Sequence, residues 1–382
     1  MKLKHYIITL SILLANSCQV SERSQEITKN SEEVNIDSKL PKNIILMIGD
    51  GMGISQITAG MYSNNGFLNL ERCKILGLIK THSKNKLITD SAAGATAFAT
   101  GKKTKNGMIS QAMSDSADYK TFIEYAEENK KATGIVVTST VTHATPACFY
   151  AHYPKRYKAN EPISSQFINS GIEVLIGGGK HYFENRTDGR NLLSELKEDN
   201  YTILDTITQE FDTKNIDKLV YLYSPYQPGK LIFEPKDEHP SRGPILPLAT
   251  EKALEVLKKD TNGFFLMVEG SQIDWGGHDN NSEYIVNEVK DFDKAIQKVL
   301  DFAKLDGETL VIITADHETG GYAIIDGNKD GTNLKGGFST LHHSASMIPV
   351  FAYGKGAEAF AGIYDNTEIF NKMMSAFGYS TK

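Results

Sequence analysis

Acidic residues and histidines gather directly after two apolar segments of the sequence. Glu269, Asp274 and His278 lie within ten residues of one another after one apolar run, and Asp316 and His317 follow another. Histidine nitrogen and carboxylate oxygen are ligands that zinc favours, and a catalytic zinc keeps one position open for water or substrate. A single acid or histidine after a strand usually caps a loop, but this combination predicts a metal site.

Two further segments carry the same chemistry. Asp50 directly follows an apolar run, and the pair His342 and His343 precedes one. The spacing to the following run favours His343 as the ligand of the pair. Two metal ions about 4 Å apart can hold the attacking and leaving oxygens of a phosphoryl group in line. The four segments together therefore indicate a two-metal site for phosphoryl transfer.

Ser91 is the candidate nucleophile. It begins a stretch rich in alanine, with Gly101 as a stop, so we expect a helix whose first turn presents the Ser91 hydroxyl and free N–H groups to an anion. Such a serine taken alone is more often a helix cap. A serine hydroxyl needs a base or a metal to become nucleophilic. The chain has no Gly-x-Ser-x-Gly motif, which favours a metal-activated serine over a catalytic triad.

The elements that position these residues are predicted to be strands alternating with helices. Short non-alternating apolar runs are typical of strands buried on both faces, as in a parallel sheet. They cover residues 43–49, 133–138, 263–268, 310–315 and 347–354. Residues 283–303 have the apolar spacing of a helix. We expect an α/β fold with a mostly parallel sheet flanked by helices on both faces, and ligands beyond the carboxyl ends of its strands.

The chain divides into three segments by composition. Residues 1–18 have a basic start, a short apolar core and small residues before Cys18, which predicts a signal peptide too short to span a bilayer. Residues 19–40 are polar, charged and free of aromatic side chains, as in a flexible tether. We expect residues 41–382 to form one catalytic domain, with 155–245 as a less regular region of loops.

The cysteines and the net charge indicate where the protein is located and which partners it binds. Cys18 resembles a bacterial lipoprotein processing site, so two outcomes stay open: a lipid anchor at Cys18, or ordinary cleavage that removes it. Either outcome predicts export across the inner membrane, to the periplasm or to a membrane-anchored form. Cys73 and Cys148 fit buried free thiols better than a disulfide. A net charge of −6 with a pI near 6.0 gives no sign of a nucleic-acid-binding surface.

Four motifs together resemble the alkaline phosphatase family. They are GDGMG at 49–53, TDSAA at 89–93, the Glu-Gly, Asp and His of 269–278, and TADH at 314–317. Their order and spacing are more specific than any one of them, and the resemblance runs from about residue 42 to about residue 375. It implies the three-layer fold of that family, hydrolysis of phosphate monoesters to inorganic phosphate through a phosphoserine, two Zn²⁺ ions, one Mg²⁺ ion and a homodimer.

The resemblance also implies a role for each matching residue. Ser91 matches the nucleophile, Arg156 the phosphate-binding arginine, and Asp90 the acid that orients this arginine. The implied metal ligands are Asp274, His278 and His343 for the first zinc, Asp50, Asp316 and His317 for the second, and Asp50, Thr145 and Glu269 for the magnesium. A guanidinium fork suits two phosphoryl oxygens, which agrees with the role implied for Arg156.

Two positions depart from the enterobacterial form of the family. His143 stands where those enzymes carry an aspartate beside the magnesium, and Trp275 where they carry a lysine. The same pair resembles certain bacterial members, including cold-adapted ones. Because the replacements remove a carboxylate and a cation, we expect weaker phosphate retention and activity that responds more to added Mg²⁺. Trp275 alone fits an ordinary packing aromatic equally well.

Two classes of alternative function remain at this stage. One is a phosphodiesterase or sulfatase of the same superfamily, and the other is a non-catalytic lipoprotein that binds phosphate or metal. No Cys-x-Pro-x-Arg motif surrounds Ser91, which disfavours a sulfatase. Thr145 and Glu269 disfavour a diesterase, since those enzymes lack these magnesium ligands. A complete set of ligands together with a nucleophile disfavours a protein without turnover.

Overall fold

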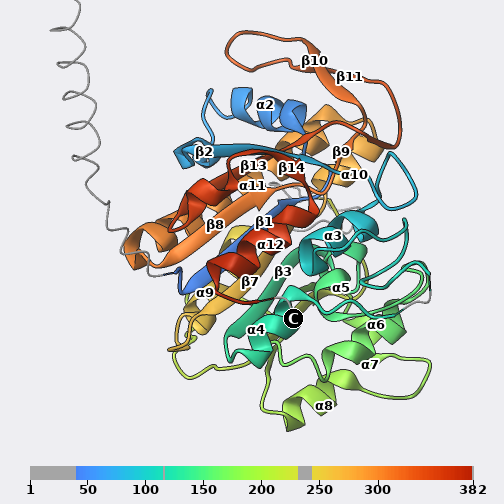
Figure 1. Ribbon diagram of the computed structural model, residues 1–382, viewed down its shortest axis with the longest axis vertical. Coiled ribbons are helices and arrows are strands. Elements are labelled where there is room, and N and C mark those ends of the chain that lie inside the picture. The colour runs from blue at the N-terminus through green and yellow to red at the C-terminus, as the bar shows by residue number, and fades with distance from the viewer. Residues whose placement is uncertain (1–39, 115–116, 231–242, 381–382) are drawn as a thin grey trace, which may run out of the picture. The chain divides into compact units, whose positions relative to one another are not determined.

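A ten-stranded sheet runs through the protein, in the order β14-β2-β13-β8-β1-β7-β3-β4-β6-β5 (Figure 1). The structure is a computed structural model that describes residues 40–114, 117–230 and 243–380. The strands are β1 (Asn43–Gly49), β2 (Ile75–Lys80), β3 (Ala132–Thr140), β4 (Val174–Gly178), β5 (Thr202–Leu204), β6 (Leu219–Ser224), β7 (Phe264–Gly270), β8 (Thr309–Thr314), β13 (Ile348–Gly354) and β14 (Gly362–Asp365). Neighbouring strands pair in parallel except at β13, which is antiparallel to both β8 and β2.

Helices cover both faces of this sheet. In a first group, α9 and α11 pack against the sheet and against each other, and α2 and α10 pack on α11. In a second group, α4 and α5 pack against β7, α3 packs on α5, and α12 packs on α3. The helices are α2 (Ile54–Tyr62), α3 (Ser91–Thr100), α4 (Phe122–Glu128), α5 (Ala144–Tyr150), α6 (Asn160–Phe167), α7 (His181–Glu184), α8 (Leu192–Glu198), α9 (Ile245–Leu257), α10 (Ile273–His278), α11 (Ser282–Asp306) and α12 (Thr367–Ala376). Two 3₁₀ turns are η1 (Asn69–Arg72) and η2 (Ala357–Phe360). This confirms the predicted α/β class.

Two short antiparallel pairs lie outside the main sheet. β9 (Glu318–Thr319) pairs with β12 (His343–Ser344), and β10 (Tyr322–Asp326) pairs with β11 (Lys335–Phe338). The first pair matters for function, because it places His343 opposite Thr319, only two residues after His317. A segment that begins after β8 and one that precedes β13 are thereby joined at the same end of the sheet.

The structure differs from the sequence-based expectation in two places. The run at 347–354 forms β13, which is antiparallel and not parallel, because burial on both faces produces the same apolar run in either direction. Residues 155–245, expected to be irregular, include β4 and β6 of the main sheet. Those strands are short and separated by polar loops, so their apolar pattern is weak in the sequence.

From Leu40 onward the described residues form one compact unit. The predicted signal peptide at 1–18, including Cys18, and all but the last residue of the tether at 19–40 lie outside the described residues. Within the described part, Cys73 and Cys148 are both free thiols, half-buried and buried respectively. Among the helices of that part, none is long and apolar enough to cross a bilayer.

Candidate active site

Three buried acids meet where adjacent strands end. β8, β1 and β7 are neighbours, and Ile48 is level with Glu269 on one side and with Thr314 on the other. Asp50 directly follows β1, and Asp316 lies two residues beyond β8. Glu269, Asp50 and Asp316 are each fully buried. The parallel register therefore brings together acids that are far apart in the sequence.

These three acids are only partly satisfied by hydrogen bonds from the described residues. Burial and the charge of Asp316 raise the pKa of Asp50 well above its usual range. Burial raises the pKa of Glu269 to about 8, and burial with the charge of Asp274 raises the pKa of Asp316 to about 7. One oxygen each of Asp50, Glu269 and Asp316 has no hydrogen-bond partner among the described residues. A bound divalent cation would supply the compensation that these charges lack.

Two histidines turn their Nε2 atoms toward each other, 3.2 Å apart. The Nδ1 of His278 lies 2.6 Å from the carbonyl oxygen of Leu341, and the Nδ1 of His343 lies 2.8 Å from that of Thr89. A carbonyl only accepts, so each Nδ1 must carry a proton, and Nε2 is the nitrogen of each ring that can bind a metal ion. Both Nε2 atoms also lie within 3.5 Å of Asp274 Oδ1. Three acceptors that face one another fit a metal ion.

The candidate ligands form three groups. Within each group the ligand atoms lie within 4.8 Å of one another. The groups are Asp274, His278 and His343; Asp50, Asp316 and His317; and Asp50, His143 and Glu269. Asp50 belongs to two of them, so these two sites would share a ligand. Nitrogen-rich and oxygen-rich groups stand side by side, which suits two different metals.

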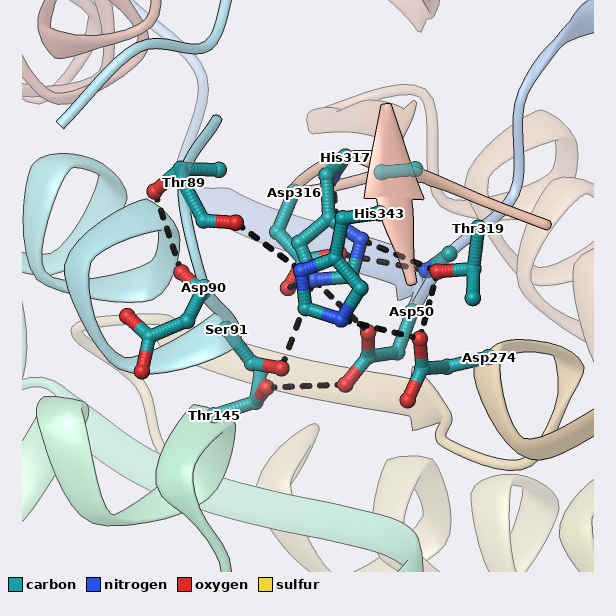
Figure 2. A network of polar contacts seen from close by, with 12 residues as sticks. Asp50, Thr89, Asp90, Ser91, Thr145, Asp274, Asp316, His317, Thr319 and His343 are labelled. Atoms are coloured by element: carbon teal, nitrogen blue, oxygen red, sulfur yellow. Dashed lines mark hydrogen bonds and ion pairs between the residues drawn. The ribbon is translucent and has the colours of Figure 1, made fainter. Parts of the chain in front are cut away.

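Ser91 lies at the start of α3, beside the second of these groups (Figure 2). Its Oγ is 3.4 Å from His317 Nε2, and its side chain is buried. Asp90 caps the helix by accepting from the N–H of Ala93 at 3.0 Å. The helix approaches closely because Gly94 has no side chain: a Cβ there would lie 3.0 Å from the Cβ of Asp316. The small residues of α3 thus allow the hydroxyl to reach the acids.

Arg156 reaches the same place from the loop after α5. Its Nη1 pairs with Asp90 Oδ2 at 3.5 Å, and its Nη2 lies 3.2 Å from His143 Nε2. The N–H of Gly107 donates to the same Asp90 oxygen, and the Gly107 carbonyl accepts from the backbone N–H of Arg156. Burial and the Arg156 charge lower the pKa of His143 to about 3, so this ring is neutral. The guanidinium is held on two sides beside Ser91.

Ser91, Asp90, Arg156 and His143 line one pocket of about 400 Å³, together with the first ligand group of Asp274, His278 and His343. Its lining includes the polar side chains of Ser91 and Arg156, and Ile88 and Tyr157 contribute exposed apolar surface to it. Trp275 also lines it and contacts the His143 ring edge-on, with 6.1 Å between the ring centroids. Such a pocket fits a small anion at its base and leaves room for a variable group above.

The remaining predicted residues are placed as follows. Thr145 Oγ1 donates to Asp50 Oδ2 at 3.4 Å from the first turn of α5. His342 lines the pocket but is exposed, and its ring lies 6.3 Å from that of His278. His343 is the member of the pair that joins His278 and Asp274.

Sequence reasoning missed Thr319. Its hydroxyl contacts Asp274 Oδ1 at 2.5 Å and His317 Nδ1 at 3.2 Å, so it touches a member of two metal groups. Gln56 donates to the carbonyl of Thr319 and to the carboxylate of Glu318, and these two hydrogen bonds hold the backbone of Thr319 in place. The only signal in the sequence was its position two residues after His317, and a threonine there has many ordinary uses.

Comparison with known proteins agrees with this geometry. Residues 41–336 match the family model described as alkaline phosphatase. The chain is 32% identical to alkaline phosphatase 3 of Bacillus subtilis, covering 98% of this chain and 96% of that one. The chain belongs to the alkaline phosphatase family. Its fold is shared with the alkaline phosphatase from the Antarctic bacterium TAB5, with a TM-score of 0.82 and 45% identity over 90% of this chain and 99% of that chain.

A second structure of the TAB5 enzyme is a histidine-to-aspartate mutant with Mg bound in its M3 site, at 44% identity, a TM-score of 0.81 and the same coverage of both chains. The protein is thus an alkaline phosphatase, an enzyme that hydrolyses phosphate monoesters, from a metal-dependent family. The three ligand groups are candidate sites for its metal ions.

Proposed function

We propose that this alkaline phosphatase cleaves phosphate monoesters through a phosphoserine at Ser91, with two Zn²⁺ ions and one Mg²⁺ ion. The observation that carries the proposal is the position of the Ser91 hydroxyl. It lies 3.4 Å from His317, at a helix N-terminus, in the pocket that Arg156 also lines. A nucleophile, an anion-binding fork and buried acceptors meet there, as transfer of a phosphoryl group requires.

The proposed metal ligands follow from donor chemistry. Asp274, His278 and His343 would hold one zinc, and Asp50, Asp316 and His317 the second. Asp50, Thr145 and Glu269 offer oxygen donors for magnesium, with His143 beside them. When bound, such ions lower the pKa of a coordinated hydroxyl or water and neutralise charge on the phosphoryl oxygens. A relative of this chain, the histidine-to-aspartate mutant of the TAB5 enzyme, holds Mg in its M3 site, which supports the presence of a magnesium site in the family.

The protein's own groups account for the course of the reaction. The Arg156 fork binds two phosphoryl oxygens and orients the phosphorus toward Ser91. Ser91 Oγ gives up its proton to solvent and forms a bond to phosphorus while the bond between phosphorus and the alcohol oxygen breaks, and the alcohol oxygen takes a proton from solvent as it leaves. A water molecule then attacks the phosphoserine, Ser91 regains its proton, and phosphate leaves with net retention at phosphorus. Asp90 keeps the guanidinium aligned throughout.

Replacing the nucleophile tests this proposal. We expect Ser91→Ala to lose at least about 10³-fold in kcat and to abolish the phosphoserine found by mass spectrometry after an acid quench. Ser375→Ala, an exposed serine on α12, serves as the control and should behave as wild type. Turnover by Ser91→Ala at the wild-type rate, or a phosphoserine at another position, would refute the assignment.

Elemental analysis tests the metals. Protein purified with Zn²⁺ and Mg²⁺ should contain about two zinc ions and one magnesium ion per chain. His278→Ala should lose one zinc selectively. A protein that turns over without any divalent metal would contradict the assignment of all three groups.

We also propose that the N-terminal segment directs export and that Cys18 carries a lipid anchor. The support is the basic, apolar and small-residue order of residues 1–18. Mass spectrometry of the mature N-terminus distinguishes a lipidated Cys18 from a cleaved chain that lacks it. A homodimer is proposed by analogy with the family, and sedimentation velocity measures it directly.

The superfamily alternatives have less support. The relatives reported above are named alkaline phosphatases, and none is named a diesterase or a sulfatase. Turnover of a phosphate monoester should exceed that of the matching diester and sulfate ester. The opposite order would favour one of the alternatives.

A further inference from the structure

His143 lies between a candidate cation site and the phosphate-binding arginine. Its Nε2 is 3.2 Å from Arg156 Nη2, and its Nδ1 is buried without a hydrogen-bond partner among the described residues. A guanidinium only donates, so Nε2 must accept. A neutral imidazole has one acceptor and one N–H, which places the proton of His143 on Nδ1 whenever the Arg156 contact is made.

The same ring is a candidate metal ligand. One nitrogen of His143 lies within 4.8 Å of carboxylate oxygens of Asp50 and Glu269. A ring nitrogen can bind a cation only through a lone pair. If Nδ1 were the ligand, the proton would move to Nε2 and point at Arg156; if Nε2 were the ligand, its lone pair would no longer be free for Arg156. The two contacts exclude each other in either case.

Each terminal nitrogen of the arginine contacts one side chain, and the guanidinium carbon also lies 5.4 Å from the centroid of the Tyr157 ring. Asp90 pairs with Nη1 at 3.5 Å, and His143 contacts Nη2. Both terminal nitrogens keep a second N–H that can face a phosphoryl group. Loss of the His143 contact would therefore leave Nη2 without its side-chain partner, and the fork would be less well ordered for two phosphoryl oxygens.

We propose that His143 is a positioning residue that holds either Arg156 or a cation beside Asp50 and Glu269, so that cation binding releases one anchor of the phosphate-binding arginine. The proposal rests on the proposed role of Arg156. It explains why a ring with one unused buried nitrogen stands at this position. By linkage, removal of Arg156 must strengthen cation binding through His143.

A double-mutant cycle on Mg²⁺ binding tests the exclusion. The protein is saturated with zinc, and Mg²⁺ is titrated by equilibrium dialysis with elemental analysis. Trp275 is the only tryptophan of the chain and contacts His143, so its fluorescence reports the same event. Arg156→Met removes the charge and the donors at similar length. His143→Ala removes the ring, and the double variant isolates the coupling between them.

We expect Arg156→Met to tighten Mg²⁺ binding about tenfold when His143 is present, and about threefold or less in the His143→Ala background, where only long-range repulsion remains. Equal tightening in both backgrounds would overturn the proposal, because the ring would then play no part in the coupling. Mg²⁺ binding that does not change in His143→Ala would overturn it as well.

The ring proton gives a second measurement that simple packing would not change. In ¹⁵N-histidine-labelled protein without Mg²⁺, the His143 signal, identified by its loss in His143→Gln, should show a protonated Nδ1 and an acceptor Nε2. Added Mg²⁺ should change that pattern. His143→Gln keeps an acceptor for Arg156, so its KM should stay near the zinc-only wild-type value, whereas His143→Ala should raise KM without an equal fall in kcat.

A protonated Nε2 in the absence of Mg²⁺ would contradict the proposal. A failure of the His143 proposal can be distinguished from a failure of the proposed reaction, because the reaction is measured separately by phosphoserine formation at Ser91. A zinc-only enzyme that labels Ser91 but shows no coupling between His143 and Arg156 would leave the reaction intact and refute only this inference.

Discussion

The Thr319 hydroxyl has a distinct role toward each of two proposed metal groups. It donates to Asp274 Oδ1 at 2.5 Å, which leaves its oxygen to accept from His317 Nδ1 at 3.2 Å (Figure 2). The His317 proton is thereby held on Nδ1, and Nε2 presents its lone pair toward Ser91. Partners of this kind orient metal ligands and set their tautomer.

Replacement of Thr319 should therefore weaken metal binding without removing a ligand. We expect Thr319→Val, which has nearly the same volume, to lower zinc affinity about 10–100-fold, measured by competition with a chelator. Thr319→Ser keeps the hydroxyl and serves as the matched control, with affinity within about threefold of wild type. If valine and serine gave the same affinity, the hydroxyl would have no orienting role.

At the scale of elements, the distance between α3 and the end of β8 is set by Gly94. A Cβ at this position would lie 3.0 Å from the Asp316 Cβ, so a side chain requires one of the two elements to move by a few tenths of an ångström. Alanine favours a helix over glycine by up to about 1 kcal/mol, which offsets part of the strain.

We expect Gly94→Ala to change activity more than stability. Its Tm should stay within about 4 °C of wild type, while kcat/KM falls at least about tenfold because Ser91 and Asp316 are displaced from each other. Gly94→Ser adds one more atom and should give a larger loss. Wild-type activity in both variants would show that this spacing is not required.

A second element-scale feature lies at the opposite end of the sheet, between α4 and β3. Burial and the charge of Glu173 raise the pKa of Glu127 to about 7, and Thr133 donates to both carboxylates, from its hydroxyl to Glu127 and from its backbone to Glu173. Since the folded pKa is above the unfolded value near 4.3, this group contributes most to stability at low pH. That contribution is lost as the pH rises through 7.

Glu127→Gln should remove this pH dependence, because the amide oxygen still accepts from Thr133 but cannot ionise. At pH 9 we expect the variant to be more stable than wild type by on the order of 1–2 kcal/mol, a figure reduced for the partial exposure of the side chain, with a smaller difference at pH 5. Thermal melts at both values measure it, with the exposed Glu198→Gln as control. A difference that did not grow with pH would contradict the raised pKa.

For the whole molecule, stability and metal content should be linked. One oxygen each of Asp50, Glu269 and Asp316, at the carboxyl end of the sheet, has no hydrogen-bond partner in the part of the chain that the structure describes, so we expect acids there to destabilise a metal-free protein. We expect a chelator to lower Tm by on the order of 10 °C, and added Zn²⁺ and Mg²⁺ to restore it. Asp274→Asn should respond less to the chelator. Identical melting with and without metal would contradict the proposed ligand groups.

Much of the fold could be predicted from local pattern. The run at 43–49 coincides with β1, and the helix expected at 283–303 lies within α11. The direction of β13 could not be predicted, because an apolar run records burial and not which neighbour a strand pairs with. β4 and β6 were missed since their short runs depend on neighbours for stability.

The chemistry of the candidate site follows from its acids, histidines, serine and arginine, several of which adjoin apolar runs. Residue type and local spacing carry that information. Which of these groups touch depends on the fold. Thr319 contacts Asp274, and His143 contacts Arg156, through elements whose relative placement depends on strand register and helix packing. Such contacts arise from long-range pairing, which no local pattern encodes.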